Sequence, residues 1–107
     1  MNIAALEKML ARGRDDALLR FGLGDAYLRD GQANAAITHL RAAVEQKPEY
    51  SAAWKLLGKA YVEAAELEQA LNSYKAGINA AEAAGDRQAA KEMTVFARRV
   101  QKSLAAT

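Results

Sequence analysis

The residues best placed for binding chemistry are two lysines, Lys55 and Lys59, which are four positions apart in the segment 51–64. Residues four apart share one face of a helix, so a helical segment would bring the two ammonium groups together. Such a pair can hold an acidic side chain or a terminal carboxylate of another molecule. The competing interpretation is that both are solvated lysines on an exposed face, and the sequence leaves the two interpretations open.

The residues needed for catalysis or metal binding are scarce. His39 is the only histidine and cysteine is absent, which excludes a histidine cluster, a thiolate metal site and a cysteine nucleophile. We expect His39 to be an ordinary exposed side chain on a helix. Neighbouring carboxylates such as Asp15 and Asp16 suit helix caps, and the chain lacks a contiguous glycine-rich loop for phosphates. We therefore predict a protein that is not an enzyme and has no cofactor or metal.

The charge balance gives weak guidance about partners. Fifteen basic and thirteen acidic residues leave a net charge of +2, which is too small to imply a polyanion partner from the total. The last segment is locally basic, with cations at Arg87, Lys91, Arg98, Arg99 and Lys102. This segment is either a polyanion-facing patch or a solvated outer face. Nucleic-acid binding is the least favoured function, because no exposed aromatic row or known reading motif accompanies the charge.

The distribution of apolar residues favours a soluble, cytoplasmic protein without a membrane partner. No run approaches the roughly 20 apolar residues of a membrane span. Glu7 and Lys8 also interrupt the N-terminal segment, where a secretory signal would need about 7 to 15 apolar residues in a row. At 107 residues, the chain has the length of one domain.

Apolar spacing predicts six helices and no strand, and therefore an all-α fold. Gly31 and Gly85 are expected to end helices, and Pro48 lacks the amide hydrogen that would let a helix continue. Asp15 or Asp16 is placed to cap the second helix. The second helix is expected to run from this cap to about residue 30. The other five cover about residues 2–11, 33–46, 51–64, 67–83 and 87–104.

The chain repeats itself with one fixed period. The matched pairs are Leu23 with Leu57, Gly24 with Gly58, Ala26 with Ala60, Tyr27 with Tyr61, Ala36 with Ala70, and Leu40 with Tyr74. A period of about 34 residues is typical of a stacked helix-pair solenoid. Together with Trp54 before the second Leu-Gly-x-x-Tyr motif and Pro48 at the end of the first unit, the pattern resembles the tetratricopeptide repeat (TPR).

The resemblance implies a right-handed α-α superhelix of antiparallel helix pairs, in a small stand-alone TPR protein. The expected single domain, 1–107, divides into an N-terminal capping helix at 1–14, repeats at 17–50 and 51–84, and a C-terminal capping helix at 85–107. The first helix would imitate the second helix of a preceding repeat, because Leu6 lies one period before Leu40. Solenoids need capped ends, since an inner repeat exposes apolar surface on both sides.

The matched small residues have a packing explanation. Gly58 would let the second helix of its pair approach closely, so a Gly58→Leu change should cost about 1 to 3 kcal/mol of overpacking strain. One large position does not match, because the first repeat has Arg20 where the second has Trp54. We expect this to leave an aromatic slot empty in the first repeat, with the neighbouring Phe21 compensating for it.

In the TPR family, the first helices of successive repeats line a concave groove that receives a peptide or a partner helix. The resemblance places in or near this groove Leu18, Phe21, Asp25, Leu28 and Arg29 from the first repeat and Ala52, Lys55, Lys59, Val62 and Glu63 from the second. Phe21 is either an anchor for an apolar side chain of the partner or packs against the first helix. The family's carboxylate clamp needs asparagine where Asp25 and Lys59 stand, so that clamp is not expected.

The sequence therefore predicts a non-catalytic interaction module or adaptor for another protein. It would bind a peptide or one helix of a partner in the concave groove, and an acidic or mixed-charge segment would suit the two lysines. The alternative is a structural subunit or a self-associating assembly factor that uses the same surface.

Overall fold

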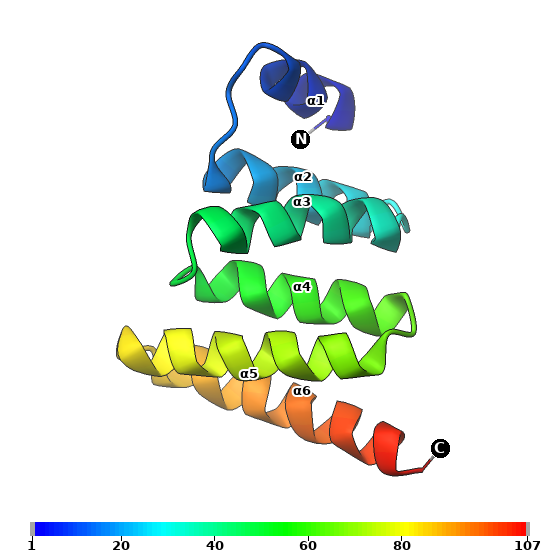
Figure 1. The fold of residues 1–107 in the computed structure, drawn as a ribbon, viewed down its shortest axis with the longest axis vertical. Coiled ribbons are helices and arrows are strands. Elements are labelled where there is room, and N and C mark those ends of the chain that lie inside the picture. Colours follow the sequence, from blue (N-terminus) through cyan, green and yellow to red (C-terminus); the bar gives the residue numbers. More distant parts are fainter. Residues whose placement is uncertain (1, 107) are drawn as a thin grey trace.

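The computed structural model describes residues 2–106, and these form six helices, which confirms the predicted all-α class. Figure 1 shows the helices stacked in chain order along the longest axis of the molecule. The thinnest dimension is 19 Å, enough for two layers of helices packed about 8–10 Å apart. The helices are α1 (Ile3–Ala11), α2 (Ala17–Arg29), α3 (Ala33–Gln46), α4 (Ser51–Glu63), α5 (Leu67–Ala83) and α6 (Arg87–Ala105). Residues 1 and 107, the ends of the predicted domain, lie outside the described residues.

Short polar side chains and left-handed turns set the helix ends. Of the two predicted candidates, Asp16 caps α2, and its Oδ1 accepts a hydrogen bond of 2.8 Å from the amide of Leu19. The turn after α2 uses Gly31 at φ 75°, and the turn after α4 uses Ala65, one period later, at φ 60°. Alanine carries a steric cost in this conformation that glycine avoids. The two repeats therefore keep one turn geometry with different residue types.

Glycines mark the places where consecutive helices approach most closely. A Cβ atom added at Gly58 would lie 2.5 Å from Cε1 of Tyr74, so the tyrosine ring of α5 occupies the space that a side chain on α4 would need. Gly24 and Leu40 repeat this contact between α2 and α3. The predicted close approach is therefore confirmed.

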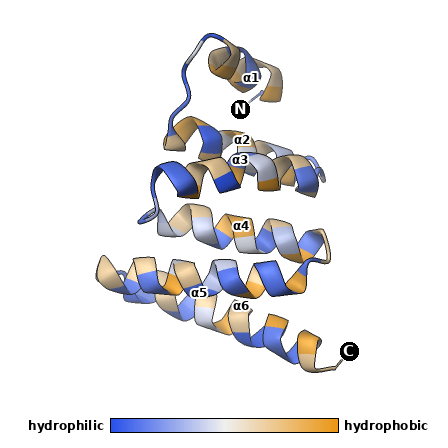
Figure 2. Ribbon diagram, viewed as in Figure 1, coloured by the Kyte–Doolittle hydropathy of each residue, from blue (hydrophilic) through white to orange (hydrophobic). Residues whose placement is uncertain are grey.

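The buried residues form three groups. The central group joins α2, α3 and α4 around Leu40, and a second joins α5 to α6 around Met93. A smaller group fastens α1 to α2 and includes Leu6 and Leu23. Figure 2 shows hydrophilic residues concentrated in the α1–α2 and α3–α4 connections, whereas each helix carries both kinds of residue. The solenoid is therefore held by successive layers of apolar contact, with α1 attached by the smallest of them.

The expectation that His39 is exposed is wrong. Its side chain lies between α1 and α2, and only 9% of the residue is exposed. The ring stacks on Tyr27 with centroids 5.4 Å apart, and Nε2 lies 3.3 Å from Oε1 of Glu7. Nδ1 lies 3.1 Å from a guanidinium nitrogen of Arg20, which can only donate, so Nδ1 accepts and Nε2 carries the hydrogen. His39 is therefore a neutral ring held from both sides.

The expected empty aromatic slot at Arg20 is also wrong. The guanidinium forms two hydrogen bonds of 2.8 and 2.9 Å with the carboxylate of Asp15 as well as the contact with His39. These bonds, together with one from Gln46, lower the pKa of Asp15 to about 2. A polar network thus takes the place of the second repeat's tryptophan, and Phe21 instead stacks on Tyr50.

The close approach at Gly58 predicts opposite effects for two glycine-to-alanine changes. Gly58→Ala should lower the free energy of unfolding by about 1–3 kcal/mol, because the new methyl group would overlap the Tyr74 ring. Gly22→Ala in α2 should raise it by about 1 kcal/mol, since no atom lies within 4 Å and alanine favours helix. Urea denaturation of both variants tests this, and effects of equal sign would contradict the packing argument.

The buried His39 ring predicts an acid-sensitive stability. Burial lowers the pKa of His39 below its ordinary value near 6.5, so the unfolded chain takes up the proton first. The contribution of the neutral His39 ring to the free energy of unfolding should therefore be fully present above about pH 6.5 and should be lost as the pH decreases. Between pH 7.5 and 5.5 the urea midpoint should fall more in the natural protein than in a His39→Gln variant. An equal fall in the two proteins would show that the ring does not couple folding to protons.

Candidate functional site

One cleft of about 660 Å³ lies on the side of the molecule to which α2, α4 and α6 contribute. It is lined by Phe21, Asp25, Ala52, Lys55, Leu56, Lys59, Val62, Glu63, Tyr74 and Phe96. We call it the concave cleft. Seven of the ten positions that the sequence placed in or near a groove come together here.

The remaining three predicted positions lie elsewhere. Leu28 is buried in the central core and is 7% exposed, so it supports the fold rather than the cleft. Leu18 is 64% exposed but does not line the cleft. Arg29 projects from the end of α2 and pairs with Asp25 at 3.0 Å. Arg29 therefore influences the cleft only by pairing with the carboxylate of Asp25, which lines it.

Aromatic rings form the apolar part of the concave cleft. Phe21 stacks on Tyr50 with centroids 5.1 Å apart, and Phe96 of α6 tilts against Tyr74 at 5.7 Å. Phe21 belongs with the central core, so the interpretation that it packs against α1 is wrong. The cleft therefore offers aromatic rings from α2, α5 and α6, beside the aliphatic side chains of Leu56 and Val62 from α4.

The two lysines of the cleft are in different electrostatic surroundings. Nζ of Lys55 lies 3.2 Å from Oε1 of Glu92 and 5.9 Å from the centroid of the Phe96 ring. Lys59 forms no ion pair or hydrogen bond within the described part of the chain. Sequence reasoning missed this asymmetry because Glu92 and Phe96 come from α6, which does not follow the repeat. Lys59 is the cation of the cleft that is free to meet an incoming acid.

Comparison with known proteins identifies the family to which this helix-pair architecture belongs. Residues 27–93 match the model of a family described as tetratricopeptide repeat. The chain belongs to the tetratricopeptide repeat family. It is 53% identical over 103 residues to the TPR repeat-containing protein PA0015 of Pseudomonas aeruginosa, which covers 96% of this chain and 98% of that protein.

Solved structures show the same fold. Protein BPP2914 from Bordetella parapertussis superimposes with a TM-score of 0.83 and 42% identity, covering 99% of this chain and 92% of that one. The TPR domain of Sgt2 from Aspergillus fumigatus superimposes with a TM-score of 0.82 and 26% identity, covering 98% of this chain and 69% of that one. On the predicted repeat boundaries, α2 and α4 are then the first helices of the two TPR repeats.

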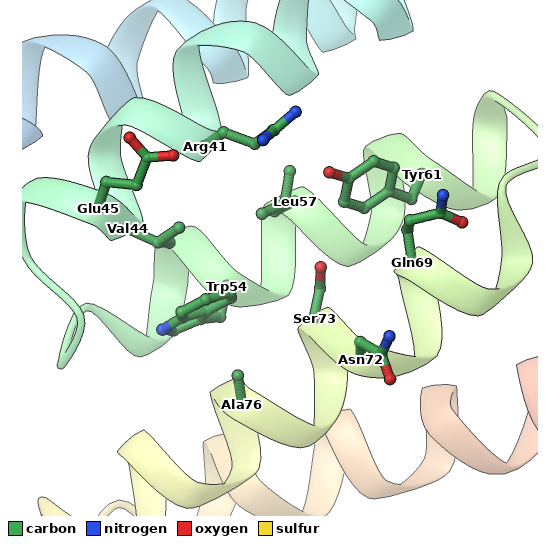
Figure 3. Close-up of a pocket in the computed structure, with 10 residues that line it drawn as sticks. All are labelled: Arg41, Val44, Glu45, Trp54, Leu57, Tyr61, Gln69, Asn72, Ser73 and Ala76. Atoms are coloured by element: carbon green, nitrogen blue, oxygen red, sulfur yellow. The ribbon is translucent and has the colours of Figure 1, made fainter.

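A second cleft of about 340 Å³ lies between α3 and α5, with α4 beneath it, and Figure 3 shows its residues. We call it the α3–α5 cleft. It is lined by Arg41, Val44, Glu45, Trp54, Leu57, Tyr61, Gln69, Asn72, Ser73 and Ala76. The indole nitrogen of Trp54 donates a hydrogen bond of 2.7 Å to the carbonyl oxygen of Pro48, which fixes the ring at one end. None of the residues expected to line a groove lies here, and Trp54, Leu57 and Tyr61 belong to the packing motif of the TPR.

The basic residues predicted on the last helix lie along the exposed side of α6. Arg87, Lys91 and Arg98 line one shallow hollow with Val95, and Arg98, Arg99 and Lys102 line the next. All five are exposed, and Arg99 also lies 5.8 Å from the Phe96 ring. Within residues 2–106, no helix is both long and apolar enough to cross a membrane. The same residues contain no group of three or more histidine or acidic side chains arranged for a metal ion.

Proposed function

We propose that this TPR protein is a non-catalytic adaptor whose concave cleft binds a short peptide or one helix of a partner protein. The observation that carries the proposal is a cleft of about 660 Å³ that combines aromatic rings with the unpaired ammonium group of Lys59. Clefts of this kind suit a ligand with a large apolar side chain and a nearby carboxylate.

The apolar contacts would supply most of the affinity. Burying one large apolar side chain of the partner against Phe21, Leu56 and Phe96 contributes about 1.5–3 kcal/mol. An exposed ion pair contributes roughly 0–1 kcal/mol, so a carboxylate on Lys59 would mainly set the orientation and partner choice. We therefore assign the aromatic residues to affinity and Lys59 to selectivity.

Lys55 would have a different role from Lys59. Its ammonium group already contacts Glu92 at 3.2 Å, so an incoming acid would have to compete with a carboxylate of the same chain. Glu92 also holds Lys55 near the Phe96 ring, which shapes the α6 wall of the cleft. Lys55 thus maintains the cleft, and Lys59 makes the larger electrostatic contribution to the partner.

This proposal predicts how binding responds to charge. After affinity capture of the partner from the source cell, its interacting peptide should bind Lys59→Glu about tenfold more weakly than the natural protein, a loss of about 1.4 kcal/mol. This exceeds the value of the ion pair alone because the reversed charge also repels the carboxylate of the peptide. Val62→Ser should also weaken binding, because Val62 is 39% exposed in the cleft and its loss removes apolar contact. Isothermal titration calorimetry measures both.

Lys91→Glu is the matched control, since it makes the same charge change on an exposed part of α6 outside the concave cleft. It should leave the affinity within twofold of the natural value. Equal losses in Lys59→Glu and Lys91→Glu would indicate a general charge effect and would remove the concave cleft as the site. Light scattering that shows a tight dimer burying this cleft would likewise favour self-association instead.

A further inference from the structure

The α3–α5 cleft lies on the other side of α4 from the concave cleft. Lys55, Lys59 and Val62 face the concave cleft, whereas Leu57 and Tyr61 face the α3–α5 cleft. Its polar side chains lie beside apolar surface without pairing with one another, and Arg41, Glu45, Gln69 and Asn72 among them are exposed to solvent. Within residues 2–106, hydrogen bonds and ion pairs are absent from the side chains of Arg41, Glu45, Tyr61, Gln69, Asn72 and Ser73.

Ser73 is the clearest case, because it is 4% exposed and lines the cleft. Hydroxyl groups on helices commonly donate to the carbonyl oxygen one turn earlier. Thr38, Thr94 and Ser103 all do so, at 3.3, 2.8 and 3.1 Å. Ser73 forms no such bond, so its hydroxyl remains available to a group inside the cleft.

The internal repeat shows what kind of group is missing. The positions one period earlier than Arg41, Tyr61 and Ser73 are Glu7, Tyr27 and His39. In that earlier unit, Oε1 of Glu7 accepts a hydrogen bond of 3.0 Å from the Tyr27 hydroxyl and lies 3.3 Å from Nε2 of His39. A carboxylate on α1 thus satisfies a tyrosine and a second donor across the same helix arrangement.

The later unit keeps the donors and lacks the acid. Tyr61 repeats Tyr27, Ser73 supplies a hydroxyl in place of the imidazole N–H, and Arg41 replaces the carboxylate of Glu7 with a guanidinium. In Figure 3 the hydroxyl groups of Tyr61 and Ser73 point toward the space beside Leu57, and the Arg41 guanidinium reaches from α3 to the edge of that space. Three donors around one space, one of them cationic, match the acceptor pattern of a carboxylate.

We propose that the α3–α5 cleft is a second binding site, which takes an acidic side chain from a partner peptide. The carboxylate lies between Arg41, Tyr61 and Ser73, and an adjacent apolar side chain of the peptide lies on Trp54. Glu45, near the Trp54 end in Figure 3, repels an acid there and so fixes the direction of the peptide. The occupant is a peptide rather than a small anion, because the cleft of about 340 Å³ has the Trp54 ring in its lining and is much larger than a carboxylate.

This site is independent of the concave cleft, so the two can be tested separately. The probe is a displayed library of random twelve-residue peptides, selected on the natural protein. Trp54 is the only tryptophan of the chain, so its fluorescence reports occupancy of the α3–α5 cleft when tryptophan-free selected peptides are titrated. Enriched peptides should contain Asp or Glu next to a large apolar residue, and changing that acid to its amide should weaken binding at least tenfold.

Three variants test whether the carboxylate of the peptide contacts Arg41 and Tyr61. Arg41→Gln and Tyr61→Phe should each weaken the acidic peptide about fivefold or more, and in Arg41→Gln the preference for the acid over its amide should shrink. Neither side chain forms a hydrogen bond in the described structure, so we expect both variants to keep the fold. Lys59→Glu, on the opposite side of α4, should leave this affinity unchanged.

Other outcomes separate the two proposals. Peptides that depend on Lys59 and not on Arg41 would overturn the second site and support the concave cleft. Peptides that depend on Arg41 and not on Lys59 would support the second site alone. Enriched peptides without an acid, or a selection that enriches none, would overturn the carboxylate assignment.

Discussion

The rest of this structure depends on the absence of a side chain at a few helix crossings. Because Gly58 leaves room for the Tyr74 ring, and Gly24 for Leu40, the two helices of each pair come close enough to share one apolar layer. Gly77 extends the same contact to the last helix, where Met93 fills the space. These crossings hold α4 between its neighbours and leave two of its sides available. Both clefts therefore owe their shape in part to glycines that line neither of them.

The internal repeat separates the residues that build the fold from those that distinguish one unit from the next. Leu23 and Leu57 are buried in both units, as the repeat requires. Arg20 and Trp54 hold the same position, yet the first joins a polar network and the second forms an apolar cleft wall. A repeat protein can thus keep its packing while each interval between helices acquires its own chemistry.

The features that could be predicted from the sequence are those that depend on residues close along the chain or one period apart. Helix spans, the Asp16 cap and the close approach at Gly58 follow from local signals and from the repeat, and the structure confirms them. Sequence reasoning could not predict the burial of His39, whose partners come from α1 and α2, far along the chain. The pairing of Lys55 with Glu92 was missed for the same reason, because α6 departs from the repeat register.

Because α1 is weakly attached, we expect it to unfold separately from the rest of the protein. Among the described helices, the backbone of α1 approaches only α2, and its apolar contact is the smallest of the three buried groups. Elements held by few buried contacts open before the molecule as a whole unfolds. Amide hydrogens of α1 should therefore exchange with solvent through a local opening that costs less free energy than global unfolding. Such an opening would also release Tyr27 and His39 from Glu7, and the solenoid would then have a native substate that is one helix shorter.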